Sequence, residues 1–191
     1  MPARITVQQA IADSPCGESP GLAAACNVAD YSTMGEIEGP YEEIQAQIDE
    51  LRGLIPQRDA ASADVSGWSV GMHVHHCGLA MSTIAGTLIE CDEPAPARKP
   101  GPRASMILES GTIPRGVAQA PDVAIPTRDV SSRVLEEILG ESEARLDRLP
   151  PVGDRCWFRH FALGMLTKRD AVRFMSVHNA HHLKIVADIL S

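Results

Sequence analysis

The segment from Phe174 to Leu190 constrains the fold more than any other, because it is predicted to be a helix with two histidines on its core-facing side. Successive residues of an α-helix are turned by ~100°, so residues four apart lie on one face and one turn apart. His178 and His182 have this spacing. Two imidazoles placed in this way can converge on a single divalent cation, so the pair predicts one side of a metal site. The same face carries an apolar stripe, formed by Phe174, Ile185 and Ile189.

The distribution of all seven histidines supports this interpretation, because six of them form two clusters and one is isolated. The first cluster is His73, His75 and His76, the second is His178, His181 and His182, and His160 stands alone. Two helices that meet at one site would bring the clusters together. Histidines on an apolar face also occur as hydrogen-bonded core residues, so a bundle without any metal is the alternative.

Bulk composition excludes several function classes. A chain of 191 residues suits one domain, and a net charge of -8 argues against a nucleic-acid-binding or anionic-membrane surface. The first residues show no apolar region of the secretory type, and no apolar run of about 18 residues occurs. The five cysteines are odd in number and lack a C-x-x-C motif. We therefore expect a cytoplasmic protein with reduced thiols, acting on a small molecule without nucleic acid or membrane, with a homodimer left open.

Apolar residues recur at helical spacing in four segments, at about 40–55, 69–90, 130–148 and 168–190. Three of them have start signals: Pro40 before two glutamates, Ser69 as an N-cap, and Thr167 with Asp170 as a capping box. No segment has a convincing strand pattern. The sequence therefore predicts an all-α four-helix bundle over residues 40–191, preceded by an N-terminal extension, 1–39, packed on the domain or on a partner.

Residues 91–126 are expected to form a long crossover loop without a helix, because half of the fourteen prolines occur there. Long irregular connections are often pocket walls or lids. The loop carries four basic residues that are either solvated charges or contacts for an anionic substrate: Arg98, Lys99, Arg103 and Arg115.

The choice of ligand in the first cluster is not decided by spacing, since His73 and His76 lie on the same flank of the predicted helix while His75 points elsewhere. His160 precedes the last helix, where it is either a proton-transfer group or a capping or surface residue. The stretch Gly67-Trp-Ser-Val-Gly71 matches a nucleophile elbow in letters only, because a polar segment stands where that motif needs a buried strand.

Two motifs resemble the DinB-like family. The stretch Trp68-Ser-Val-Gly-Met-His-Val-His-His76 resembles the opening of that family's second helix. The stretch from Phe161 to Asp170, with His178-Asn-Ala-His-His182 after it, resembles the last helix and the Gly-x-Leu-Thr turn before it. Gly111-Thr-Ile-Pro-Arg-Gly116 is similar to an uncharacterised branch. The resemblance covers about residues 40–190.

The resemblance implies an up-down-down-up four-helix bundle that holds one divalent metal through three histidines. Carried over position by position, the ligands are His76, His178 and His182, which leaves His73, His181 and His160 as second-shell or alternative ligands. Characterised branches use bacillithiol, mycothiol or glutathione as a cosubstrate. Lys184-Ile185 stands where the thiol-transferase branch tends to have Arg-Gly-Gln, so the precise activity does not carry over.

Three imidazoles without a carboxylate leave metal positions open for water or substrate, which is typical of catalytic sites. Nickel, zinc and iron all suit imidazole. The sequence therefore supports two functions. One is a metal-dependent transferase that uses a low-molecular-weight thiol on a small electrophile. The alternative is a non-catalytic metal-holding bundle that acts as a binding or interaction module.

Overall fold

The computed structural model describes residues 35–92, 99–116 and 119–191. The predicted extension, 1–39, lies almost wholly outside these residues, so its packing stays a prediction. The described elements are α1 (Gly35–Gly53), α2 (Val70–Ile89), α3 (Pro102–Ser110), α4 (Ser132–Leu146) and α5 (Lys168–Ile189), the 3-10 turns η2 (Ile55–Gln57) and η3 (Asp122–Ala124), and the strands β1 (Trp157–His160) and β2 (Gly164–Thr167).

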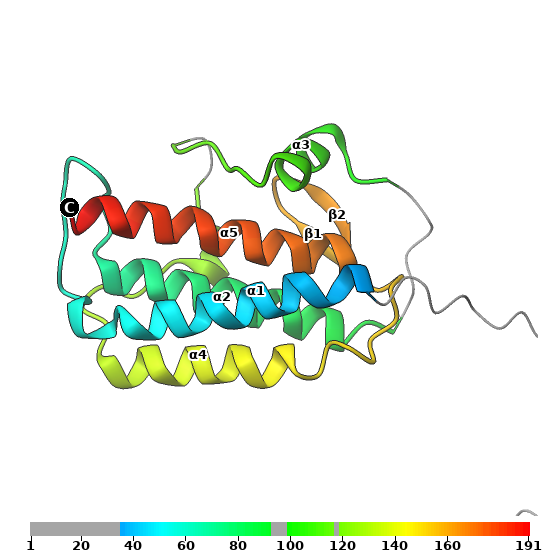
Figure 1. Cartoon of the computed structure of the whole chain (residues 1–191), viewed down its shortest axis with the longest axis horizontal. Helices are drawn as coiled ribbons and strands as arrows, with labels where there is room; N and C mark the ends of the chain where they lie inside the picture. Colours follow the sequence, from blue (N-terminus) through cyan, green and yellow to red (C-terminus); the bar gives the residue numbers. More distant parts are fainter. Residues whose placement is uncertain (1–34, 93–98, 117–118) are drawn as a thin grey trace, which may run out of the picture. The chain divides into compact units, whose positions relative to one another are not determined.

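Four of the helices form the predicted bundle. α1 packs against α4 and α5, and α2 packs against the same two helices. In Figure 1, α1 and α5 run in one direction while α2 and α4 run in the other, which is an up-down-down-up order. The fold class expected from the sequence is therefore confirmed.

The core lies where the helical periodicity placed it. Ile44, Ile48 and Leu51 of α1 are fully buried, as are Leu135 and Leu139 of α4. The stripe of the last helix is buried at Phe174 and Ile185 and partly buried at Ile189. These contacts join all four long helices in one apolar cluster.

Capping residues set the start of the helices that carry the site. The Ser69 hydroxyl accepts the N–H of Met72, which opens α2 one residue after the cap. Thr167 and Asp170 form a reciprocal capping box at the start of α5. Both predicted starts are confirmed, and each satisfies backbone donors that a helix leaves unpaired.

Two expectations about prolines are wrong. α1 begins at Gly35, so Pro40 lies inside the helix instead of opening it. Residues 91–126 contain α3, although no helix was expected there. The reason is that prolines and glycines bracket this helix instead of interrupting it: Pro102 occupies the first turn, and Gly111 ends it with φ 62.

A short hairpin precedes α5, although no segment of the sequence has a convincing strand pattern. β1 and β2 pair antiparallel, with Trp157 opposite Thr167 and His160 opposite Gly164. Gly164 has φ 79, a conformation that glycine adopts without steric cost. The hairpin matters for the site because its first strand ends in His160.

The cysteines also depart from expectation, because Cys91 and Cys156 form a disulfide. The expectation of reduced thiols is therefore wrong for this pair. The two residues are 65 positions apart in sequence, and only the fold brings the end of α2 next to the start of β1. Cys77 is free and buried, and burial raises the pKa of its thiol.

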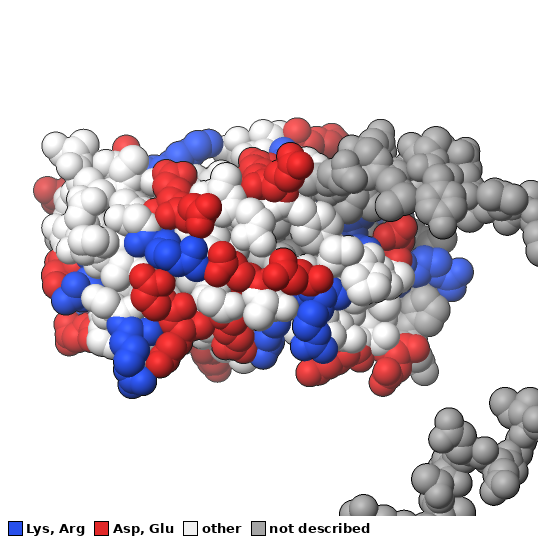
Figure 2. Space-filling view, turned by 60° about the horizontal axis from the view of Figure 1, so that its bottom comes forward, with Lys and Arg blue, Asp and Glu red and all other residues white. Residues whose placement is uncertain are grey.

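No helix in the described ranges is both long and apolar enough to cross a membrane. On the face shown in Figure 2, Lys and Arg side chains are interspersed with Asp and Glu instead of gathering into one basic surface.

The close approach of α2 to its neighbours gives a stability prediction. A Cβ at Gly71 would lie 2.9 Å from the Arg58 Cβ and 3.0 Å from the Arg58 carbonyl oxygen, whereas one at Gly140 in α4 would meet nothing within 4 Å. We expect Gly71→Ala to lower the free energy of unfolding by about 1–2 kcal/mol through overpacking. Gly140→Ala is the matched control and should raise it by up to about 1 kcal/mol. Urea unfolding measures both, and equal effects would contradict the assignment of Gly71 to close packing.

Candidate metal centre

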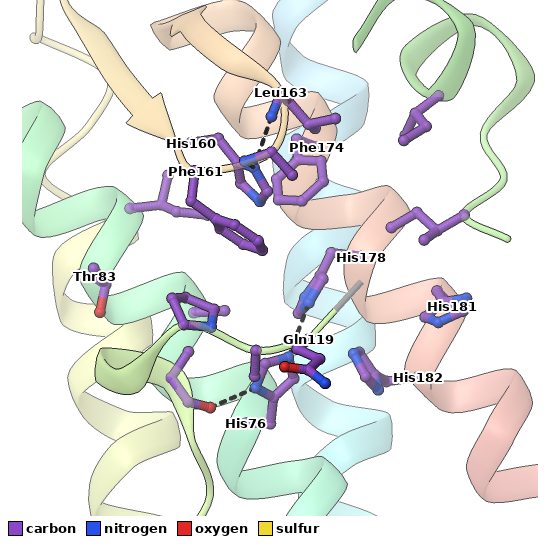
Figure 3. Close-up of a pocket in the computed structure, with 18 of the residues that line it drawn as sticks. His76, Thr83, Gln119, His160, Phe161, Leu163, Phe174, His178, His181 and His182 are labelled. Carbon is purple, nitrogen blue, oxygen red and sulfur yellow. Dashed lines mark hydrogen bonds between the residues drawn. The ribbon is translucent and has the colours of Figure 1, made fainter. Parts of the chain in front are cut away.

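α2 and α5 pack against each other and bring the two histidine clusters together. His76 of α2 and His178 and His182 of α5 form a group, here called the triad, whose ligand nitrogens all lie within 4.8 Å of one another. Figure 3 shows the three rings turned toward a common point. His76 and His182 are buried, and His178 is half-buried. The structure thus assembles the three residues that the sequence proposed as ligands.

The tautomer of His76 follows from its hydrogen bond to the backbone. Its Nδ1 lies 2.6 Å from the carbonyl oxygen of Ala124 in η3. A carbonyl oxygen only accepts, so Nδ1 carries the proton and donates it. The Nε2 lone pair is left free on the side of His178, whose own Nε2 lies 3.1 Å away. Two imidazole nitrogens at this distance need a proton or a cation between them.

His73 lies behind His182 and not in the triad. The two Nδ1 atoms are 3.0 Å apart, and the Nε2 of His73 lies 3.0 Å from the Ser66 hydroxyl. Ser66 Oγ also accepts the N–H of Trp68, and its second lone pair can accept from His73. When Nδ1–H of His182 donates to Nδ1 of His73, and Nε2–H of His73 donates to Ser66, the Nε2 atom of His182 keeps its lone pair free for a metal. Outer hydrogen bonds of this kind fix ring orientation in metal sites.

The remaining histidines take other positions. His75 is buried and accepts the N–H of Thr127 at 3.0 Å, so it faces the segment after η3. His181 lies to the side of the triad in Figure 3. His160 is at the end of β1, where its Nδ1 accepts two backbone N–H groups. Neither His160 nor His181 joins the triad, and of the two residues that spacing left open, the packing groups His76, and not His73, with His178 and His182.

Trp68 covers the triad on one side. Its ring centroid lies 5.0 Å from that of His76 and 6.1 Å from that of His182, to which it is nearly parallel. The family motif drew attention to this tryptophan, but no pattern in the sequence showed that it would touch two imidazoles. The Ala124 carbonyl was also missed, because a backbone acceptor leaves no side-chain signal.

Burial keeps the triad neutral. Desolvation is the main cause that lowers the pKa of His76 and takes the pKa values of His178 and His182 well below the usual 6.5. Neighbouring imidazoles add to the effect by mutual repulsion of their charged forms. A neutral imidazole is the form that binds a metal, so these shifts favour metal binding at neutral pH.

The same shifts predict how stability depends on pH in the metal-free protein. Burial lowers the pKa of His73 to about 4, below the 6.5 of an exposed histidine. As pH falls from 6.5 toward 4, the unfolded chain binds the proton first, so this contribution to stability is present above that window and is lost within it. We expect the Tm in EDTA to fall by at least about 5 °C between about pH 7 and 5, and a shallower fall for His73→Phe. Differential scanning calorimetry tests this, and a flat profile would contradict it.

A cavity of ≈ 180 Å³ opens beside the triad. All three triad histidines line it, together with His181 and His160. Its other walls are mainly apolar and come from α2, α3, the hairpin, α5 and residues 113–116 and 119–124. Large apolar side chains among them are Ile84, Ile107, Phe158, Phe161, Leu163 and Phe174. A small molecule in this cavity would therefore contact the triad directly while most of its surface meets apolar groups.

The donor set fits a divalent transition metal. Two nitrogens bound to one zinc at about 2.05 Å in tetrahedral geometry lie about 3.3 Å apart, close to the His76–His178 separation. In the described part of the chain, the group of candidate ligands contains histidines alone. Three imidazoles leave coordination positions free on the side of the cavity.

Comparison with known families agrees with this geometry. The sequence profile of the DinB superfamily matches residues 41–186, which is most of the chain. No curated protein and no solved structure matches the chain. The matched range contains the bundle and all three histidines of the triad, and the chain belongs to the DinB superfamily.

Proposed function

We propose that this protein is a metal-dependent transferase that joins a low-molecular-weight thiol to a small electrophile. The observation that carries the proposal is a triad of neutral imidazoles in the wall of a mainly apolar cavity. His76, His178 and His182 would hold the cation. When bound, a divalent cation would supply the positive charge that favours the thiolate form of the thiol.

The chain's own residues have three roles in this proposal. The Ala124 carbonyl and the His73–Ser66 pair hold two triad rings in the tautomers that leave Nε2 free. Trp68 covers the triad and limits the access of water. The apolar cavity wall takes the electrophile next to the triad.

The proposed reaction is a substitution that balances without a redox partner. The thiol sulfur forms a bond to carbon, the bond from that carbon to its leaving group breaks, and the thiol proton goes to solvent. Nickel, zinc and iron all fit the donor set, and elemental analysis of the purified protein would distinguish them.

Conjugation assays test this function. The reaction of glutathione, mycothiol, bacillithiol and cysteine with 1-chloro-2,4-dinitrobenzene is followed by absorbance. Each thiol is tested with metal-loaded protein, EDTA-treated protein and His178→Ala. We expect turnover with at least one thiol, in metal-loaded wild type alone. Metal-loaded protein that turns over none of them would count against the transferase.

The alternative, a non-catalytic metal-holding bundle, predicts a closed site without room for a substrate. The cavity against the half-buried His178 favours the transferase instead. A cytoplasmic location, a small-molecule substrate and a homodimer remain proposals beside it.

A further inference from the structure

His160 is held in one tautomer by the hairpin that carries it. Its Nδ1 accepts the backbone N–H of Ala162 at 3.1 Å and that of Leu163 at 3.2 Å. A neutral imidazole has one nitrogen that accepts and one that donates. Because two amides use Nδ1 as an acceptor, Nε2 must carry the proton. The hairpin turn therefore produces a fixed N–H donor.

The ring of His160 is also fixed in orientation. It stacks on Phe161, with centroids 4.6 Å apart, and meets the edge of Phe174 at 4.8 Å. Phe174 in turn lies 5.6 Å from His178, one helical turn further along α5. Figure 3 shows His160 beside Phe174, with His178 further along the same cavity. One aromatic ring therefore separates the fixed donor from the triad.

The charge state of His160 agrees with a donor that does not titrate at neutral pH. Burial, with a smaller contribution from Arg103, lowers the pKa of His160 to about 4. The ring is therefore neutral near pH 7. The two hydrogen bonds described for the His160 ring, from the amides of Ala162 and Leu163, both go to Nδ1. The ring itself is part of the cavity wall.

The cavity has the size and polarity for one small ring. Its volume of ≈ 180 Å³ is slightly above the roughly 150 Å³ of an apolar protein cavity that binds benzene. In the metal-free cavity, a neutral donor in such a wall suits a neutral acceptor oxygen, since an isolated carboxylate would lose its hydration without a buried counter-charge. Arg103, the cationic side chain in the wall, is exposed to solvent.

We propose that His160 orients the ligand of this cavity: its Nε2–H donates to an acceptor oxygen, such as a carbonyl, on an otherwise apolar ring-sized molecule whose remainder lies toward His178. The proposal specifies the chemical class of the electrophile. It rests on the proposed function, which makes this cavity the binding site of that electrophile. Binding and orientation themselves require no metal, and the test uses this.

The test compares acetophenone with ethylbenzene, which have nearly the same shape and differ in the carbonyl oxygen. Affinities are measured by NMR titration of the full chain, with metal and after EDTA treatment. We expect wild type to prefer acetophenone over ethylbenzene by roughly three- to tenfold, the value of one neutral hydrogen bond. H160F should abolish this preference while keeping ethylbenzene affinity, and H160Q, which restores an N–H donor, should recover part of it.

Two controls separate this proposal from the others. T83V removes the Thr83 hydroxyl, a different hydrogen-bonding group of the cavity wall, and should keep the preference. In ¹⁵N-histidine spectra, the signal lost in H160F should have the Nε2–H pattern. An Nδ1–H pattern, an unchanged preference in H160F, or tighter binding of benzoate than of acetophenone by the EDTA-treated protein would overturn the proposal. Loss of metal or of thiol turnover with the preference intact would instead count against the transferase alone.

Discussion

Replacing His178 with alanine should remove the bound metal. Wild type is expected to purify with about one metal ion per chain and His178→Ala with almost none, because two imidazoles in place of three leave an incomplete site. His178 also faces the cavity, so its loss exposes the remaining ligands to water. Elemental analysis after dialysis measures the metal content directly.

His181→Ala is the matched control, since it removes an imidazole three residues along the same helix but outside the triad. It should keep the metal. A second measurement uses linkage: EDTA should lower the Tm of wild type and of His181→Ala but leave that of His178→Ala unchanged, because only a bound metal stabilises the folded state. A His178→Ala protein that retains metal would show that another set of ligands holds it.

The second large effect separates His76 from His73, which lie in the same cluster. His76→Ala should abolish metal binding, because its Nε2 faces His178 and is proposed as one of the three ligand atoms. His73→Ala should keep the metal but bind it 10- to 100-fold less tightly, by about the value of an outer hydrogen bond to a ligand. Competition with a chromogenic chelator measures both dissociation constants.

Ser66→Ala provides the graded control for this series. It removes the last member of the hydrogen-bond series that runs from His182 through His73 to Ser66. Its effect on the metal dissociation constant should therefore be smaller than that of His73→Ala. If His73→Ala abolished binding while His76→Ala kept it, the roles assigned to the two residues would be reversed.

The bundle was predictable because its helices bury regular stripes. Ile44, Ile48 and Leu51 recur at helical spacing, and all three are fully buried. Ser69 and Thr167 are polar caps whose hydrogen bonds are local in sequence, so their roles could be read from neighbouring residues. Helical periodicity and capping are properties of a few consecutive residues, so the sequence contains the information that predicts them. The buried stripes and the two caps are confirmed.

The elements that line the cavity were harder to predict, because they depend on position within a proline-rich segment and on distant contacts. Proline density led to the expectation of a loop without a helix and so hid α3, whose Pro102 and Gly111 stand at its two ends. The strands β1 and β2 are each four residues long, which is too short to show a clear alternation of apolar and polar residues.

The site shows the same division. Helical spacing joined His178 to His182, and the family motif pointed to His76. The position of His73 behind the triad depends on the rotation of α2 against α5, which spacing alone does not contain. The Ala124 carbonyl that orients His76 is a backbone group 48 residues away, so only the fold reveals it.

The disulfide between Cys91 and Cys156 constrains one part of the chain covalently and leaves the other part held by packing alone. It closes a covalent loop that contains α3, the Ala124 turn and α4, while His76 precedes this loop and His178 and His182 follow it. In the chain-entropy description, closing a loop of this length stabilises the fold by about 4 kcal/mol. Reduction would release this constraint on part of the cavity wall and leave the triad on its own pair of helices. The thiol proposed as a cosubstrate is itself a disulfide reductant, so the protein's substrate would also be a reagent that loosens the wall of its own binding site.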